Sequence, residues 1–333
     1  MADNEAPLAL TMGDPAGIGP ELAIAAWRLR SPRDAPFFVI ADPGLLASLA
    51  RRLGLEVRIV EAEPDRTAAA IGRGLPVVPL ERRVKAEPGR TDAGDAGATI
   101  ESITRAVVAV RRGEARAIVT NPIAKATLYE AGFGFPGHTE FLADLARRAW
   151  GDPVFPVMMI WSKALAVVPA TIHIPLAEAA RALSKELLLK TARVVDRDLR
   201  RRFDLARPRL AFAGLNPHAG EGGAIGREEI DVIAPAIESL RAEGIDAVGP
   251  MPADTMFHAR ARAAYDVAVT MYHDQGLIPV KTLAFDEGVN VTLGLPFVRA
   301  SPDHGTAFDI AGKGIARPTS LIAALRLADR LSR

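Results

Sequence analysis

The chain has 333 residues, of which 49% are hydrophobic, and it contains no cysteine. This length is enough for about two domains or one large one. The lack of cysteine excludes disulfides, thiolate metal sites and cysteine nucleophiles. The 41 Lys and Arg residues nearly balance the 40 Asp and Glu residues, so we expect neither nucleic acid nor an anionic membrane as a partner. No apolar run reaches membrane-spanning length and the first residues show no secretory leader, so we expect a soluble, cytoplasmic protein.

Short β-rich runs alternate with helical stretches along the chain, which predicts an α/β fold around largely parallel or mixed sheets. The expected strands are 37–41, 56–60, 115–120, 164–172, 209–215 and 265–271. The expected helices are 99–112, 140–150, 184–203, 228–243 and 319–331. In the first of these helices, Ile100, Ile103, Val107 and Val110 recur at helical spacing, and Gly113 follows as a stop signal.

The stretch LTMGDPAGIGPE opens the chain with a glycine pattern. Gly17-Ile18-Gly19 resembles the start of a dinucleotide-binding fingerprint, but Leu22 stands where the third glycine belongs. The stretch also lies too near the first residue to follow a well-formed strand. We therefore expect a tight strand-to-helix turn here and no Rossmann site.

The stretch FPGHTEFLADLARRAW predicts a helix that begins near Glu140. Thr139 is placed to cap this helix, which leaves His138 beside its N-terminus. Free N–H groups and the helix dipole favour an anion such as phosphate at that position. Capping by Thr139 alone is the simpler alternative.

Three of the six histidines share one arrangement, in which an apolar strand ends in a histidine: His173, His218 and His273. Carboxyl ends of strands converge on the ligand crevice of α/β sheets, so these imidazoles could meet. Three imidazoles with an open fourth position suit zinc or another first-row divalent ion. Three separate, hydrogen-bonded loop histidines are the alternative. Asp274 could orient a ligand or bind a substrate ammonium group, or it could only cap a turn.

Basic and amide side chains recur through PVKTLAFDEGVNVTLGLPFVR, where Lys281 and Arg299 flank Asn290. These residue types suit a phosphate or a carboxylate, arginine through its bidentate fork.

Farther along, DHGTAFDIAGKG combines small residues with polar edges at His304 and Asp309. The chain carries no GxSxG, HExxH or Walker pattern, which disfavours serine hydrolases, zincins and P-loop NTPases.

Nine motifs in their order along the chain resemble the 4-hydroxythreonine-4-phosphate dehydrogenase family of vitamin B6 (pyridoxal phosphate) biosynthesis. They are TMGDPAGIGPE, TNPIAK, GHTEFLA, TIHIPL, GLNPHAGEGG, PADT, MYHDQGL, GVNVTLGLPFVR and SPDHGTAFDIAGKG. The resemblance implies two α/β/α domains like those of isocitrate and isopropylmalate dehydrogenases, and a homodimer whose active sites use both chains. We expect a discontinuous first domain, 1–130 plus 305–333, and a second domain at 131–304.

The resemblance also assigns roles to residues of this chain. It implies a divalent metal (zinc, magnesium or cobalt) bound by His173, His218 and His273. The implied substrate-binding residues are His138, Thr139, Lys281, Asn290 and Arg299. Asp254 and Asp274 match acidic residues near the site and are candidate proton relays. The implied NAD(P)+ site falls on His304, Gly305, Ala307, Asp309 and Gly312.

The implied reaction is the oxidation of 4-(phosphooxy)-L-threonine by NAD(P)+ to a β-keto acid that decarboxylates to 3-amino-2-oxopropyl phosphate. A paralogous dehydrogenase of phosphorylated threonate or erythronate is the nearest alternative. A metal-dependent phosphate-ester hydrolase or acyl-phosphate transferase is a more distant one. A non-catalytic binding module would leave the three strand-end histidines unexplained.

Overall fold

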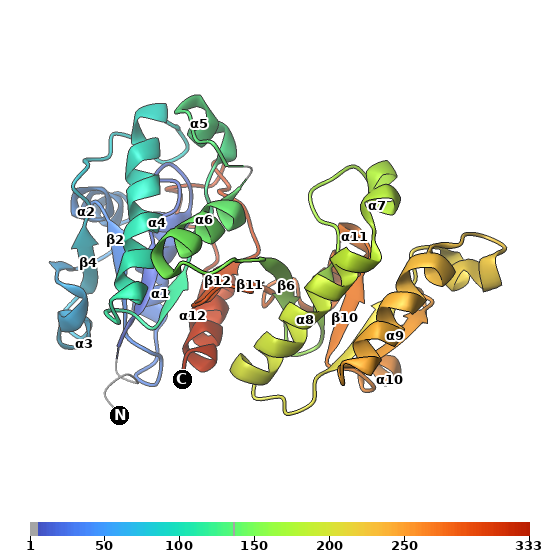
Figure 1. Cartoon of the computed structure of the whole chain (residues 1–333). Coiled ribbons are helices and arrows are strands. Elements are labelled where there is room, and N and C mark those ends of the chain that lie inside the picture. Colours follow the sequence, from blue (N-terminus) through green and yellow to red (C-terminus); the bar gives the residue numbers. More distant parts are fainter. Residues whose placement is uncertain (1–5, 136) are drawn as a thin grey trace. The chain divides into compact units, whose positions relative to one another are not determined.

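The computed structural model describes residues 6–135 and 137–333. The chain forms two compact units, and each is described here by itself (Figure 1). The first unit ends at Val154 and resumes at Leu295, whereas the second is the continuous segment Phe155–Gly294.

The first unit is discontinuous, and it includes residues 131–154 and 295–304, which the sequence assigned to the second domain. Residues 131–154 belong to it because α6 (His138–Trp150) packs on α4 (Ala96–Arg111). Residues 295–304 also belong to it, because β12 (Val298–Pro302) forms a parallel pair with β5 (Ala117–Val119).

A parallel sheet with the order β3-β4-β2-β1-β5-β12 forms the centre of the first unit. The remaining strands are β1 (Leu8–Thr11), β2 (Phe37–Ala41), β3 (Ile59–Glu61) and β4 (Leu75–Pro79). Every residue of β1 and β2 is buried, which is typical of a sheet covered by helices on both faces.

Helices cover this sheet (Figure 1). Besides α4 and α6 they are α1 (Gly19–Leu29), α2 (Pro43–Arg52), α3 (Thr67–Ala70), α5 (Lys125–Glu130) and α12 (Thr319–Leu331), with short 3-10 turns at Pro64–Arg66 and Ala93–Asp95. α4 contacts β1 and β2, whereas α12 contacts β12 and β5 and packs on α1. The expected helix at 319–331 has the observed bounds of α12. In α4, Ile103 and Val107 are buried as expected, but Ile100 and Val110 are only partly buried.

The expectation that no strand precedes the first glycines was wrong. The four residues of β1 are enough, because they pair on both sides, with β2 and with β5. The turn that follows has a left-handed residue at Gly13 (φ 76°) and leads into α1, so it is the tight strand-to-helix turn that the glycines predict.

The second unit has a mixed sheet with the order β11-β6-β7-β10-β8-β9. Its strands are β6 (Val157–Trp161), β7 (Ala166–Pro169), β8 (Arg209–Ala213), β9 (Asp246–Met251), β10 (Val267–Thr270) and β11 (Val289–Leu293). β11, β6 and β7 pair antiparallel, whereas β7, β10, β8 and β9 run parallel. The carboxyl ends of β7, β10 and β8 therefore lie at one edge of the sheet.

The helices of the second unit pack around this sheet. They are α7 (Leu176–Ala182), α8 (Lys185–Arg202), α9 (Ala234–Ala242), α10 (Ala259–Arg262) and α11 (His273–Ala284), with a 3-10 segment η3 (Pro217–Gly223) and a π-turn η4 (Glu229–Ile233). α8 packs beside α9, and α11 contacts β7, β10 and β6 (Figure 1). The expected helix at 228–243 is thus a π-turn followed by α9.

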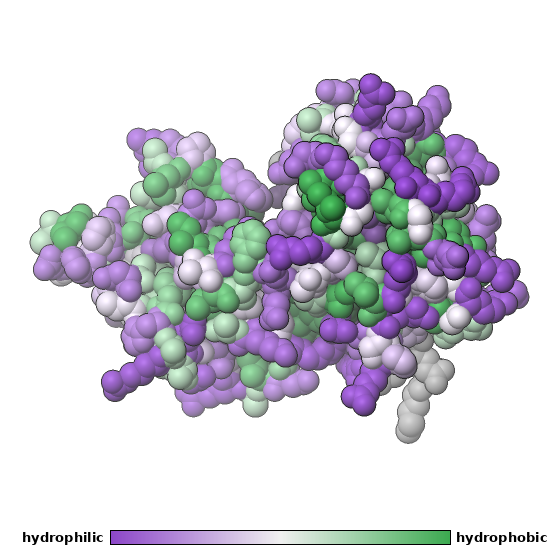
Figure 2. Space-filling view, turned by 180° about the vertical axis from the view of Figure 1, so that it is seen from behind, coloured by the Kyte–Doolittle hydropathy of each residue, from purple (hydrophilic) through white to green (hydrophobic). Residues whose placement is uncertain are grey.

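Polar and charged side chains are spread over the face seen in Figure 2, with apolar ones between them. Among the described residues, no helix combines the length and the apolar character needed to cross a membrane.

Candidate functional site

The three strand-end histidines all belong to the second unit. His173 follows β7, His218 follows β8, and His273 is the first residue of α11, after β10. Because β10 pairs with β7 on one side and β8 on the other, the three turns that carry these histidines are neighbours.

The structure brings His173 and His273 together. Their ring centroids are 5.7 Å apart, and both rings line a depression of about 250 Å³ with Tyr272, Asp274 and Leu176. Nδ1 of His273 lies 2.6 Å from Oδ1 of Asp274. Since a carboxylate only accepts hydrogen bonds, Nδ1 is the donor, and in the neutral imidazole Nε2 has a lone pair for a ligand.

Two buried side chains tie the histidine-bearing turns to one another. The hydroxyl of Thr171 donates to the carbonyl of Met271 at 2.7 Å, which links the turn of His173 to that of His273. Gln275 accepts from the N–H of Met271 and donates to the carbonyl of Gly214, both at 2.7 Å. Gln275 therefore links the start of α11 to the end of β8, from which the loop of His218 departs.

His218 does not join the other two histidines in a metal cluster. Within residues 6–135 and 137–333, the structure holds no group of three or more His, Asp or Glu side chains arranged to bind a metal ion. His218 is exposed and lies in η3, in a backbone of left-handed conformation (φ 52°, ψ 29°).

Arg299 is a buried cation on β12, the last strand in the order of the first unit's sheet, with only 4% of its surface exposed. Its Nε and Nη2 both donate to the hydroxyl of Thr120, at 3.1 and 2.6 Å. Burial lowers the pKa of Arg299 to about 10, so the side chain keeps its charge at neutral pH. A buried, charged guanidinium is suited to an anion.

His138 is the first residue of α6, and Gly137 is its N-cap residue. The prediction that Thr139 caps this helix was wrong, because the helix begins two residues earlier than expected and its N-cap makes no side-chain hydrogen bond. His138 is partly exposed, but its Nε2 atom is buried and has no hydrogen-bond partner among the described residues. Burial and the nearby charge of Arg299 hold the pKa of His138 well below its usual value, which favours the neutral imidazole.

Lys281 and Asn290 belong to the second unit, whereas His138, Thr139 and Arg299 belong to the first. Lys281 lies two turns after His273 on the same face of α11, and both line a shallow groove with Leu277. Asn290 is partly exposed at the second position of β11. Asp254 is exposed in the turn after β9.

The expected cofactor residues lie in the segment between β12 and α12. Ala307 has a positive φ of 45° and Gly312 one of 69°. The N–H of Gly312 donates to the buried carboxylate of Glu21 at 2.8 Å, so the segment packs on the start of α1. The Nε2 atom of His304 is buried and unpartnered within the described part of the chain.

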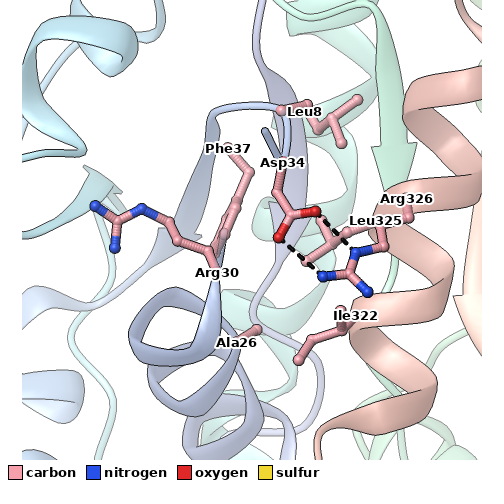
Figure 3. Close-up of a pocket in the computed structure, with 9 residues that line it drawn as sticks. Leu8, Ala26, Arg30, Asp34, Phe37, Ile322, Leu325 and Arg326 are labelled. Atoms are coloured by element: carbon pink, nitrogen blue, oxygen red, sulfur yellow. Dashed lines mark hydrogen bonds and ion pairs between the residues drawn. The ribbon is translucent and has the colours of Figure 1, made fainter. Parts of the chain in front are cut away.

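Another small cavity lies in the first unit, between the start of β2 and α12. It measures about 20 Å³, room for about one water molecule. Figure 3 shows Asp34 facing Arg326 across two hydrogen bonds of 2.8 and 3.1 Å, with Leu8, Phe37 and Leu325 around them. Its apolar lining and its internally satisfied ion pair make this cavity a packing feature.

Comparison with known proteins identifies the family. The family described as pyridoxal phosphate biosynthetic protein PdxA matches residues 33–328 of the chain. The chain belongs to this family.

Its curated relatives in the PdxA family match over their full lengths. The chain is 62% identical to the 4-hydroxythreonine-4-phosphate dehydrogenase of Methylorubrum populi, over 100% of this chain and 96% of that protein. It is 56% identical to the enzyme of the same name from Bradyrhizobium diazoefficiens, over 100% and 99%. The crystal structure of 4-hydroxythreonine-4-phosphate dehydrogenase from Klebsiella pneumoniae is similar with a TM-score of 0.86 and 36% identity, covering 98% of this chain and 100% of that one. The family resemblance seen in the motifs and the α/β fold are therefore confirmed.

Sequence reasoning did not single out five polar residues that form hydrogen bonds beside the predicted site residues. They are Thr120, Thr171, Asn216, Glu229 and Gln275. Two signals could have found some of them: Thr120 is a polar residue at the end of an apolar strand, as the histidines are, and Gln275 follows His273 by two residues.

Proposed function

We propose that this chain is an NAD(P)- and divalent-metal-dependent dehydrogenase that oxidises 4-(phosphooxy)-L-threonine. The product is a β-keto acid that loses CO2 to give 3-amino-2-oxopropyl phosphate, in the biosynthesis of pyridoxal phosphate. Membership of the PdxA family supports this reaction. The observation that carries it is the pairing of His173 with His273, beside Asp274, in one open depression.

The donor set fits a divalent metal such as Zn²⁺, Mg²⁺ or Co²⁺. The ring centroids of His173 and His273 are 5.7 Å apart, so two imidazoles lie close together. His218 follows β8, which pairs with β10, so a third imidazole is carried by an adjacent turn. We infer that His173, His218 and His273 hold the metal. When bound, it would lower the pKa of the substrate hydroxyl and stabilise negative charge on the same oxygen during decarboxylation.

A homodimer with shared sites would explain why His218 stands apart. In such a dimer, His218 of one copy of the chain could be the third ligand beside His173 and His273 of the other copy. The exposed apolar side chains of α11 and its end support such a contact: Ile278 is 63% exposed and Phe285 is 72% exposed. Large exposed apolar side chains gathered on one helix are typical of an interface.

The chain's own residues would bind and orient the substrate. Arg299 would hold the phosphate through charge-assisted hydrogen bonds, and the neutral imidazole of His138 would contact it through Nε2. Thr139, Lys281 and Asn290 complete the proposed substrate contacts. Binding energy from the phosphate would fix the reacting carbon in place.

The nicotinamide cofactor would accept the hydride, and we assign it to the segment of His304, Gly305, Ala307, Asp309 and Gly312. The buried, unpartnered Nε2 of His304 fits a ligand that brings a hydrogen-bonding group to this segment. For the proton released from the substrate hydroxyl, Asp274 or Asp254 would act as the relay. Asp274 already contacts His273, which supports it over Asp254.

The test is the formation of NADH or NADPH from 4-(phosphooxy)-L-threonine, compared with phosphorylated threonate and erythronate. Oxidation of the amino acid alone supports the proposal, whereas a preference for the sugar acids would assign the chain to a paralogous activity. His273→Ala should abolish turnover and bound metal, as measured by elemental analysis. His258→Ala is the matched control, since His258 is an exposed histidine at the start of α10.

A further inference from the structure

The loop that carries His218 contains a left-handed helical turn. Six consecutive residues, His218–Gly223, have positive φ values, from 42° at Glu221 to 96° at Gly223. His218, Ala219 and Glu221 are not glycines, and each such residue costs about 1–2 kcal/mol in this conformation. Strain of this kind persists only where the surrounding structure imposes it.

The buried carboxylate of Glu229 lies against this loop. Glu229 is 3% exposed and is the first residue of the π-turn η4. Its Oε1 accepts from the backbone N–H of Asn216 at 2.7 Å, and its Oε2 accepts from the Nδ2 of the same residue at 3.0 Å. The carbonyl of Asn216 in turn accepts from the N–H of Ala219 at 3.1 Å, directly after His218.

Glycines leave room for the same carboxylate on the inner side of the turn. A Cβ at Gly220 would lie 2.6 Å from Oε2 of Glu229, and one at Gly214 would lie 3.1 Å from Oε1. The carboxylate of Glu229 is therefore in close contact with both ends of the turn. One end is Gly214, directly after β8, and the other is Gly220, within the left-handed segment.

We propose that Glu229 is a positioning residue that holds the backbone of His218 in its left-handed, metal-binding conformation. The inference rests on the proposed role of His218 as a metal ligand. Glu229 touches neither the metal nor the substrate in this account. It stabilises a turn that is otherwise unfavourable. The imidazole of His218 is then already in position, so less conformational entropy is lost when the metal binds.

Glu229→Gln tests the proposal, because it preserves size and shape but replaces one acceptor by a donor that faces Asn216. We expect the dissociation constant for Zn²⁺, measured by competition with a chromophoric chelator, to rise about tenfold or more. The concentration of Zn²⁺ that gives half-maximal activity should rise in parallel, and excess metal should restore kcat. A purely structural role would lower the thermal stability and leave the Zn²⁺ affinity unchanged.

Glu228→Gln is the matched control. Glu228 accepts from Nδ2 of the same Asn216 at 2.7 Å but makes no contact with its backbone N–H, so the Zn²⁺ affinity should stay within about twofold of the wild-type value. Wild-type affinity in Glu229→Gln would overturn the proposal. If that variant does not fold, Gly220→Ala takes its place, because it disturbs the turn and leaves the carboxylate intact; unchanged Zn²⁺ affinity there would overturn the proposal equally.

His218→Ala separates this proposal from the one on which it rests. Loss of Zn²⁺ affinity in His218→Ala, with normal affinity in Glu229→Gln, would remove only the positioning role. Normal affinity in His218→Ala would overturn the assignment of His218 as a metal ligand, and the positioning role with it.

Discussion

The guanidinium of Arg299 donates two hydrogen bonds to one neutral oxygen, the hydroxyl of Thr120. Nε and Nη2 lie 3.1 and 2.6 Å from it. Arg299 lies on β12, and Thr120 directly follows the neighbouring parallel strand β5. The N–H of Thr120 also donates to the carbonyl of Ala300 at 3.0 Å. Because a hydroxyl is uncharged, these two bonds orient the guanidinium without adding a counter-charge.

Thr120→Val should weaken binding of the phosphorylated substrate. The substitution keeps the shape of the side chain but leaves Nε and Nη2 of Arg299 without that acceptor. We expect KM to rise about tenfold, which corresponds to about 1.4 kcal/mol, with a smaller change in kcat. Thr120→Ser keeps the hydroxyl and should stay near the wild-type values. Equal KM values for the valine and wild-type enzymes, in steady-state assays, would contradict the role given to Thr120.

Part of the candidate metal site, the pair of His173 and His273, could be predicted from the sequence because its signal is local. A histidine at the end of an apolar strand is visible in one short stretch, and His173 and His273 do meet in the structure. The supporting contacts could not be predicted, because they join distant segments. Thr120 and Arg299 are 179 positions apart, and Gln275 and Gly214 are 61 apart. Only the strand order, which single-sequence patterns do not specify, brings such pairs together.

The helices and strands likewise divide into those that the sequence predicts and those that it does not. The amphipathic helix α12 was predicted with its observed bounds, since periodicity and burial agree there. β1 was missed because four residues carry little pattern of their own and gain their stability from two neighbouring strands. The left-handed turn at His218–Gly223 could not be predicted either, because His218, Ala219 and Glu221 have no local preference for it.

Acidification should destabilise the first unit through His138. Burial, then the charge of Arg299, lowers the pKa of His138 in the folded protein, so the unfolded chain binds more protons as pH falls below about 6.5. The folded state is therefore favoured above that pH and loses stability as the pH falls toward the lower, folded-state pKa. We expect His138→Gln to flatten the decline in Tm between pH 7.5 and 5. The same substitution at exposed His258 is the control, and an equal flattening there would argue against a special role for His138.

The ion pair of Asp34 and Arg326 should contribute only modestly to stability. Its hydrogen bonds are short and paired, and the hydrogen bond from Arg326 is the main cause that lowers the pKa of Asp34. The side chain of Arg326 is 56% exposed, however, so solvent screens the pair. We expect Asp34→Asn to lower the free energy of unfolding by about 0.5–1 kcal/mol in urea titrations at pH 7.

Salt and acid provide the checks on that value. The difference between Asp34→Asn and the wild type should shrink in 1 M NaCl. Because the folded-state pKa of Asp34 is lowered, the contribution of the pair is present above about pH 3.8 and is lost as pH falls through the folded-state value. A difference that is insensitive to both salt and acid would point to packing around the cavity instead.

Gln275→Leu should cost more than the loss of that ion pair, because its amide satisfies two buried backbone groups at once. Without it, the N–H of Met271 and the carbonyl of Gly214 lose their partner in an interior that excludes water. Each unsatisfied group costs about 1–3 kcal/mol, so we expect the free energy of unfolding to fall by about 2 kcal/mol or more. Thr282→Val is the matched control on the same helix: its hydroxyl donates to Ile278 at an exposed position, where water can replace the bond. Urea denaturation of both variants measures the difference. If the two changes cost the same, Gln275 would not be the link that couples the end of β8 to the start of α11.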